Sequence, residues 1–220
     1  MRAFDLGDRG AKLASMIRAV SAALALLMAS AAAAQTPPAP PSADVTGPSA
    51  PAKSLEDPDT RRKAADDLLG RLAKTEDATS AKRIAAAVQA LWLRSGSDTV
   101  DLLTSRAGEA QRAQKLDVAI KLMDEVVSLR PDFVEGWNRR ATLRYVAKDY
   151  DEAMADIHEV LIREPRHFGA WIGLGRILSD AGFDAKALAA YRKALEIYPA
   201  VENLKKQVDE LALKVEGQPI

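Results

Sequence analysis

Residues 168–201 read FGAWIGLGRILSDAGFDAKALAAYRKALEIYPAV, and the preceding residues 134–167 read VEGWNRRATLRYVAKDYDEAMADIHEVLIREPRH. Both segments have tryptophan at the fourth position, Trp137 and Trp171, and proline at the thirty-second, Pro165 and Pro199. An earlier proline, Pro131, extends the 34-residue period back to residue 100. A fixed period of this length is typical of stacked helical hairpins.

The repeated positions alternate between small and large side chains. Small residues allow the axes of packed helices to approach to roughly 8–10 Å. Large residues fill the space beside them, so we predict that the tryptophans are core side chains. The small residues are Ala107, Ala119, Ala141, Ala153, Gly175, Ala187 and Ala194, and the large ones are Trp137, Trp171, Leu174 and Tyr191.

This pattern resembles the tetratricopeptide repeat. The signature is clearest in residues 168–201, as Trp171-x-x-Leu174-Gly175 followed by Ala187, Tyr191, Ala194 and Pro199. The resemblance covers residues 100–201 and, more loosely, 58–99. It implies an all-α fold, a right-handed solenoid of three hairpins at 100–133, 134–167 and 168–201.

We expect helices on both sides of these repeats. Residues 57–99 read as a degenerate leading hairpin that opens the stack, with Asp57-Pro58 at the start of its first helix and Ser80 capping its second. Residues 202–216 have apolar residues at helical spacing and predict a capping helix, followed by a tail at 217–220. A dimerisation helix is the alternative for 202–216.

The N-terminus predicts export. Basic residues precede a short apolar run at 19–28, and Ala32-Ala33-Ala34 follows, so residues 1–34 describe a signal peptide. An uncleaved inner-membrane anchor and a buried Ala-rich helix are the alternatives, and translation could also start at Met16. Residues 35–56, which contain six of the 11 prolines, predict a disordered Pro/Ala-rich linker.

Composition and motifs argue against several classes of function. The 31 Lys and Arg residues balance 31 Asp and Glu residues, so we expect no nucleic-acid partner. The chain has no cysteine, which excludes disulfides and thiolate metal sites. His158-Glu159 resembles the start of a zinc-protease helix, but Ile162 occupies the second histidine position. We therefore predict no catalytic residue, metal site or cofactor.

The resemblance implies that the first helix of each hairpin lines a concave groove. The outward positions of these helices combine hydrogen-bonding side chains with exposed apolar ones, which is typical of a surface that binds an extended peptide. A merely solvated helix face is the alternative. The candidate residues are Asp101, Thr104, Gln111, Arg112, Glu135, Asn138, Thr142, Tyr145, Ile172, Arg176, Ser179 and Asp180.

Other polar residues depart from the family pattern. One variant of the family binds the C-terminal carboxylate of chaperones, but the corresponding positions here hold Thr104, Gly108, Arg139, Gly169 and Gly173, so this carboxylate clamp is absent. Arg140 and Arg144 replace apolar residues and need partners inside the stack. We predict that Arg140 pairs with Asp156; an anionic ligand site is the alternative.

The sequence therefore predicts a non-catalytic interaction module of the bacterial envelope, exported to the periplasm, that binds a partner peptide or protein in the groove. An accessory subunit that positions an envelope enzyme and a membrane-anchored assembly factor are the alternatives. We expect no membrane span in the mature chain, and the sequence does not indicate the oligomeric state.

Overall fold

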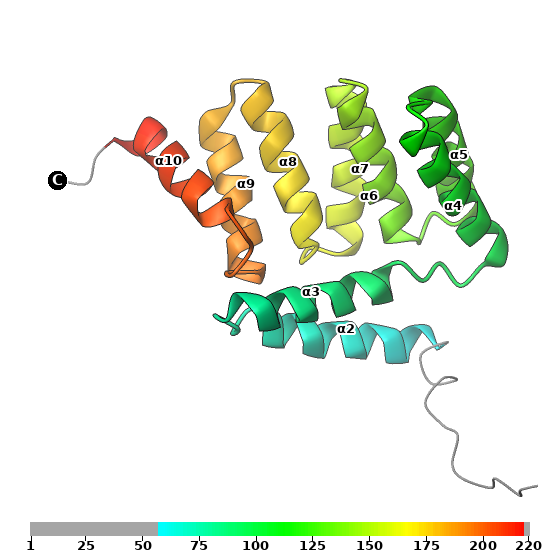
Figure 1. Ribbon diagram of the computed structural model, residues 1–220, viewed down its shortest axis with the longest axis horizontal. Helices are drawn as coiled ribbons and strands as arrows, with labels where there is room; N and C mark the ends of the chain where they lie inside the picture. The colour runs from blue at the N-terminus through cyan, green and yellow to red at the C-terminus, as the bar shows by residue number, and fades with distance from the viewer. Residues whose placement is uncertain (1–56, 218–220) are drawn as a thin grey trace, which may run out of the picture. The chain divides into compact units, whose positions relative to one another are not determined.

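The computed structural model describes residues 57–217, which all lie within the unit Pro48–Ile220. The predicted signal peptide, the predicted linker and residues 218–220 lie outside the described residues. Every regular element from residue 57 to 217 is an α-helix, which confirms the predicted all-α class (Figure 1). The helices are α2 (Pro58–Leu72), α3 (Ala78–Trp92), α4 (Asp98–Arg112), α5 (Leu116–Leu129), α6 (Val134–Val146), α7 (Tyr150–Arg163), α8 (Phe168–Asp180), α9 (Asp184–Ile197) and α10 (Leu204–Glu216).

Three hairpins, α4–α5, α6–α7 and α8–α9, stack side by side and form the predicted solenoid (Figure 1). The small residues lie where the helices meet: Ala119, Ala153 and Ala187, one per hairpin, are all fully buried. A larger side chain at such a position would push the helices apart, because protein interiors are close-packed. The 34-residue period of the sequence therefore matches the repeat of helix–helix contacts along the stack.

The two helices of each hairpin are joined by the same turn. Its middle residue has a positive φ: 58° at Gln114, 64° at Lys148 and 79° at Gly182. Two backbone bonds close the turn, for example Lys148 N–H to Tyr145 O and Asp149 N–H to Arg144 O, both 2.9 Å. This is the Schellman arrangement that satisfies the last carbonyls of a helix. Only the third turn uses glycine, the residue that adopts this conformation without strain.

Consecutive hairpins are joined by the proline turns. The tryptophan of the following helix is tied to each turn: Trp137 Nε1 donates to Pro131 O at 2.9 Å, and Trp171 Nε1 donates to Pro165 O at 2.8 Å. Both indole rings pack against the apolar core, but the residues are half-buried rather than enclosed. The ring is partly exposed because its N–H must reach a carbonyl in an exposed turn.

Helix α10 covers the apolar side of the last hairpin. Leu204 and Val208 are buried against Ala187, Leu188 and Tyr191 of α9. Gln207 Nε2 donates to the hydroxyl of Tyr191 at 3.1 Å, and the far end is held by an ion pair between Arg192 and Glu216 at 2.6 Å. The helix ends at Gly217, whose φ is 84°.

The α2–α3 hairpin does not open the stack as the sequence suggested. It lies across the ends of the repeat helices, with Leu69 and Leu72 in one apolar cluster with Phe168 of α8 and Tyr198 after α9 (Figure 1). Trp92 stacks on His167 with ring centroids 4.2 Å apart. The position that holds proline in the repeats is Ser97 here, and it caps α4 after the chain has turned at Gly96, whose φ is 71°.

The cap of α3 also differs from the expectation. Asp77, not Ser80, is the N-cap residue, and its carboxylate accepts the backbone N–H of Ser80 at 2.7 Å. Hydrogen bonds from Ser80 hold the pKa of Asp77 below its usual value. The carboxylate near the start of the helix is also favoured by the helix dipole.

None of the helices between residues 57 and 217 combines the length and the apolar composition needed to cross a membrane.

Candidate binding groove

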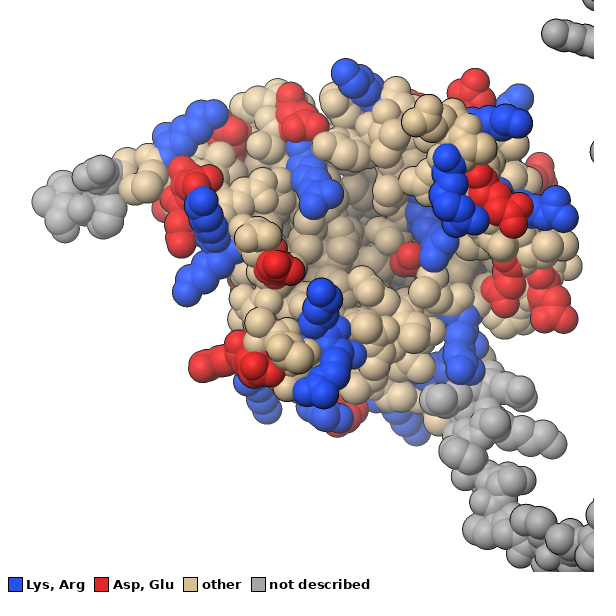
Figure 2. Space-filling model, in the orientation of Figure 1, with Lys and Arg blue, Asp and Glu red and all other residues tan. Residues whose placement is uncertain are grey.

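Two adjoining depressions run along the first helices of the three repeats. One, of about 200 Å³, lies between α4 and α6, and the other, of about 120 Å³, lies between α6 and α8. Asn138 and Thr142 of α6 line both depressions, which makes them one continuous groove. Figure 2 shows the molecular surface hollowed in this region, with few charged side chains on its floor.

Eight of the twelve predicted groove residues line these depressions. They come from α4, α6 and α8: Thr104, Gln111, Glu135, Asn138, Thr142, Tyr145, Ile172 and Arg176. The other four do not line them. Arg112 and Ser179 are at the ends of their helices. Asp101 accepts a hydrogen bond from Ser95 Oγ at 2.5 Å, and Asp180 accepts one from Tyr145.

A hydrogen-bond network fixes one wall of the groove. Glu135 accepts from Asn138 Nδ2 at 3.0 Å and from Arg139 Nε at 3.3 Å. Its carboxylate also lies 3.4 Å from Nε2 of His167, the buried N-cap residue of α8. Because His167 Nδ1 accepts the backbone N–H of Ala170 at 3.0 Å, Nε2 is the nitrogen that carries the proton and donates to Glu135. The network therefore sets the spacing of α6 and α8.

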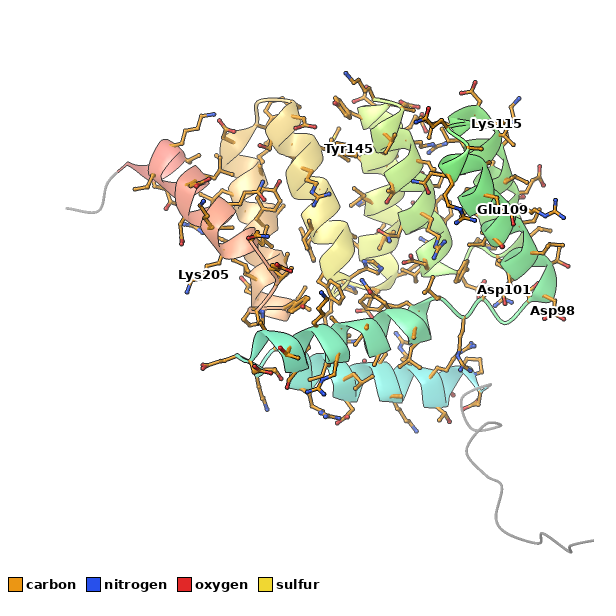
Figure 3. The ribbon with its side chains drawn as sticks, viewed as in Figure 1. Asp98, Asp101, Glu109, Lys115, Tyr145 and Lys205 are labelled. Atoms are coloured by element: carbon orange, nitrogen blue, oxygen red, sulfur yellow. The ribbon has the colours of Figure 1, made fainter. Side chains whose placement is uncertain are left out.

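Tyr145 links the far ends of the same two helices. Its hydroxyl donates to Asp180 Oδ2 at 2.9 Å, and Figure 3 shows the side chain in the space between α6 and α8. The hydrogen bond to this carboxylate, with a smaller contribution from burial, raises the pKa of Tyr145 above 10.0. The tyrosine therefore stays neutral and donating throughout the physiological range of pH.

The groove also presents polar groups that have no partner within residues 57–217. Thr104 Oγ1 is buried without a hydrogen bond, and it is the one such side-chain atom in the described part of the chain. A buried polar atom left unpaired costs about 1–3 kcal/mol. Arg176 is exposed at the groove and forms no ion pair with the described residues. Arg176 is therefore available to a ligand, whereas Thr104 Oγ1 is covered by its neighbours.

Behind the groove, the predicted ion pair is present and is part of a larger cluster. Arg140 donates to both oxygens of Asp156, at 2.9 and 2.7 Å, and to Asp124 at 2.8 Å, while Arg144 donates to Asp156 at 2.9 Å. Burial alone would lower the pKa of Arg140, but the bonds to the two aspartates outweigh it and raise that pKa. The guanidinium groups are neutralised internally, so we assign them a structural role.

The glycines of the groove were missed as site residues. Gly169 and Gly173 of α8 line the second depression and Gly108 of α4 lines the first. A Cβ at Gly173 would lie 3.4 Å from Ile157, so the missing side chain there provides space and not conformational freedom. The signal was present in the sequence, because Gly169 and Gly173 share a helix face with Ile172 and Arg176.

The histidines have separate roles. His158 is exposed on α7, and His167 is the N-cap residue of α8 described above. Within residues 57–217, no group of three or more His, Asp and Glu side chains is arranged to hold a metal ion.

Comparison with known proteins agrees with the fold. A family model described as tetratricopeptide repeat matches residues 105–157 and 149–202. A TPR repeat-containing protein of Rhizobium etli is 41% identical over 152 residues, which is 69% of this chain and 74% of that protein. The small glutamine-rich tetratricopeptide repeat-containing protein 2 of Saccharomyces cerevisiae is 27% identical over 116 residues, 52% of this chain and 34% of that protein.

Solved structures show the same repeat architecture. The first TPR of Spaghetti (RPAP3), bound to an HSP90 peptide, superposes with a TM-score of 0.52 at 16% identity and covers 55% of this chain and 95% of its own. The Yersinia enterocolitica type III secretion chaperone SycD, in complex with a peptide of the translocator YopD, gives 0.50 at 20% identity, with coverage of 56% and 97%.

Proposed function

This chain belongs to the tetratricopeptide repeat family, and we propose that it is a non-catalytic module that holds an extended segment of a partner protein in the groove of α4, α6 and α8. Proteins of this family generally act as interaction modules that bind peptides and proteins. The observation that carries the proposal is the continuity of the two depressions across Asn138 and Thr142. A continuous groove across three repeats suits an extended chain.

The chemistry of the groove supports a peptide ligand. An extended backbone offers an N–H and a C=O at every residue, and Asn138 and Thr142 carry amide and hydroxyl groups that can pair with them. Ile172 is half-exposed at the second depression and offers an apolar contact. Two of the solved structures that share the fold, the RPAP3 domain and SycD, contain a bound peptide.

The charge of the groove indicates which peptides fit. Glu135 is already paired with Arg139, whereas Arg176 is exposed and has no ion pair within residues 57–217. A peptide with one acidic side chain or its C-terminal carboxylate beside Arg176 would place opposite charges in contact. Gly108, Gly169 and Thr104 occupy positions of the chaperone-binding carboxylate clamp, so the recognition differs from that of chaperone tails.

We further propose that the module works in the bacterial envelope. The proposal rests on the charged leader, the apolar run and the small residues of 1–34, which together have the order of a secretory signal. The partner would then be another protein of the periplasm or the membrane surface. Mass spectrometry of the N-terminus of the protein purified from cells tests this: a start near Gln35 supports export with cleavage, whereas an intact N-terminus contradicts cleavage.

The groove is tested with a peptide selected by phage display against the purified full chain. The variant Asn138→Ala with Arg176→Glu should bind this peptide about tenfold more weakly or worse, because it loses an amide and reverses the charge that faces the ligand. The matched control is Ser128→Ala with Lys121→Glu, a similar change on the exposed surface of α5. Its affinity should stay at the wild-type value.

Fluorescence polarisation gives the affinities, and circular dichroism checks that each variant keeps its helicity and melting temperature. Equal affinity of the wild type and the groove variant would contradict the proposal, as would a control variant that loses as much affinity as the groove variant.

A further inference from the structure

A second pocket, of about 310 Å³, lies outside the groove. Its walls come from α2, from the end of α3 and the loop after it, and from the segments that follow α5 and α7. Five arginines line it: Arg61, Arg62, Arg94, Arg130 and Arg163. Figure 2 shows Lys and Arg side chains over the α2–α3 hairpin on the face drawn. None of the pocket residues lines the groove.

The acidic side chains of this pocket do not balance its arginines. Asp132 and Glu164 are its two acidic lining residues, and Asp132 pairs with Arg130 at 3.0 Å. Glu164 pairs at 3.2 Å with Arg166, which is not part of the lining. A further acidic residue from outside the pocket, Glu159, pairs with Arg163.

Three of the lining arginines therefore have no counter-ion among the described residues. Within residues 57–217, Arg61, Arg62 and Arg94 form no ion pair. They belong to two different segments, α2 and the loop after α3, which the hairpin brings to the same pocket.

Two of the guanidinium groups converge on the loop after α3. A Cβ placed on Gly96 would lie 3.8 Å from one terminal nitrogen of Arg130 and 3.9 Å from one of Arg61. Both nitrogens therefore border the same space beside Gly96, where the oxygens of one oxyanion could contact both of them. Gly96 has no side chain to block the approach, and its φ of 71° disfavours most other residues there.

The pocket has an apolar side as well. Trp92 and Phe133 line it, and Trp92 is the residue that stacks on His167 where the hairpin meets the repeats. Pockets of 300 Å³ or more with apolar walls and a few convergent polar groups are typical of small-molecule sites. The guanidinium group binds phosphate and carboxylate oxygens in a planar, two-pronged geometry.

We propose that this pocket binds a small, multiply charged oxyanion, a phosphate-bearing or polycarboxylate compound, through Arg61, Arg94 and Arg130. Because its walls belong to both the hairpin and the repeats, the bound anion stabilises the docking of α2 and α3 on the repeat helices. The site is independent of the peptide groove and gives the module a second, small-molecule ligand.

Isothermal titration of the full chain with pyrophosphate and, separately, with citrate tests this, at constant ionic strength set with sodium chloride. Saturable binding of pyrophosphate alone assigns a phosphate-bearing ligand, and binding of citrate alone assigns a polycarboxylate. Arg61→Gln with Arg94→Gln should weaken the binding about tenfold or more, because the variant loses two charge-assisted hydrogen bonds to the anion.

The matched control is Arg71→Gln with Arg83→Gln, which removes two charges from the same hairpin outside the pocket. The control should bind as the wild type does. If the double pocket variant loses helicity, Arg94→Gln alone, at an exposed loop residue, replaces it. Absence of saturable binding of both anions at millimolar concentration would overturn the proposal, as would equal losses in the pocket and control variants.

Tryptophan fluorescence provides a second readout. Trp92 lies in the pocket, whereas Trp137 and Trp171 lie outside it. Binding should therefore change the emission of the wild type, and the change should be smaller in Trp92→Phe while titration calorimetry still detects binding; a residual change would come from Trp137, whose ring lies 5.2 Å from the guanidinium carbon of the lining residue Arg163. An undiminished change in Trp92→Phe would place the anion elsewhere.

Discussion

The ring of Tyr191 fits into its repeat because residue 175 has no side chain. A Cβ at Gly175 would lie within 3.0 Å of three ring atoms of Tyr191. In the preceding repeat the corresponding positions hold Ala141 and Ile157. Ala141 is larger than Gly175, and Ile157 is smaller than Tyr191. The larger side chain on one helix is thus compensated by a smaller one on the facing helix, and the spacing of the two helices is kept.

Gly175→Ala should therefore destabilise the fold by about 1–3 kcal/mol, the usual cost of overpacking a core. Gly70→Ala is the control: Gly70 is exposed in the last turn of α2, with nothing within 4 Å of a new Cβ. It should gain about 0.5–1 kcal/mol from higher helix propensity. Urea denaturation followed by circular dichroism measures both, and an unchanged midpoint for Gly175→Ala would contradict the packing described.

The second residue-scale prediction concerns the ion cluster behind the groove. Asp156 is 1% exposed and receives hydrogen bonds from Arg140 and Arg144. Asp156→Asn leaves both guanidinium groups short of a counter-charge and should cost about 3 kcal/mol. Asp124→Asn removes a carboxylate of the same cluster whose side chain is 45% exposed, and should cost less than about 1 kcal/mol. Equal losses in the two variants would show that burial does not set the strength of this cluster.

At the scale of the helical elements, the turn inside the α6–α7 hairpin has a strained backbone, which a glycine would relieve. Lys148 adopts a left-handed conformation with φ 64°, where Gly182 stands in the next repeat. Lys148→Gly should raise the stability by about 1 kcal/mol. Lys121→Gly, at an exposed position inside α5, should lower it by about 1 kcal/mol. A loss of stability in Lys148→Gly in the same denaturation experiment would contradict the turn geometry.

The docking of the α2–α3 hairpin can be tested separately from the repeats. Trp92→Ala removes the ring that stacks on His167 and packs against Phe168. We expect the hairpin to lose about 2–3 kcal/mol of its docking free energy, while α4–α9 keep theirs. Hydrogen exchange should then be faster in α2 and α3 only. Leu93→Ala, at a neighbouring residue that is 39% exposed, is the control and should leave exchange unchanged.

Uniformly faster exchange in all helices of Trp92→Ala would contradict independent docking. It would mean that the hairpin and the repeats unfold as one cooperative unit.

For the molecule as a whole, the repeated elements were predictable and the first hairpin was not. Ala119, Ala153 and Ala187 occupy one position of a strict period, so their burial follows from the sequence. The position of α2 and α3 depends on contacts with Phe168 and Tyr198, about a hundred residues away, and no periodicity encodes such contacts. Asp77 as a cap was overlooked because Ser80 is an equally common capping residue.

The groove was predictable in part: its residues follow from the repeat, but the contacts between neighbouring hairpins do not. Helical spacing places Thr104, Asn138 and Arg176 on outward faces, and the repeat pattern brings these faces side by side. The bond between Tyr145 and Asp180 could not be anticipated, because it depends on how two neighbouring hairpins are spaced. The arginine pocket was missed for the same reason as the docked hairpin, since its walls come from segments that only the docking brings together.

The central claim is that the partner binds across α4, α6 and α8, and site-specific photo-crosslinking in cells tests it most directly. A photoreactive phenylalanine analogue would replace Thr142, which lines both halves of the groove, or Val118, which is 48% exposed on α5. Our account predicts a crosslinked partner from position 142, suppressed by an excess of the selected peptide, and none from position 118. Crosslinking from position 118 with none from position 142 would contradict it.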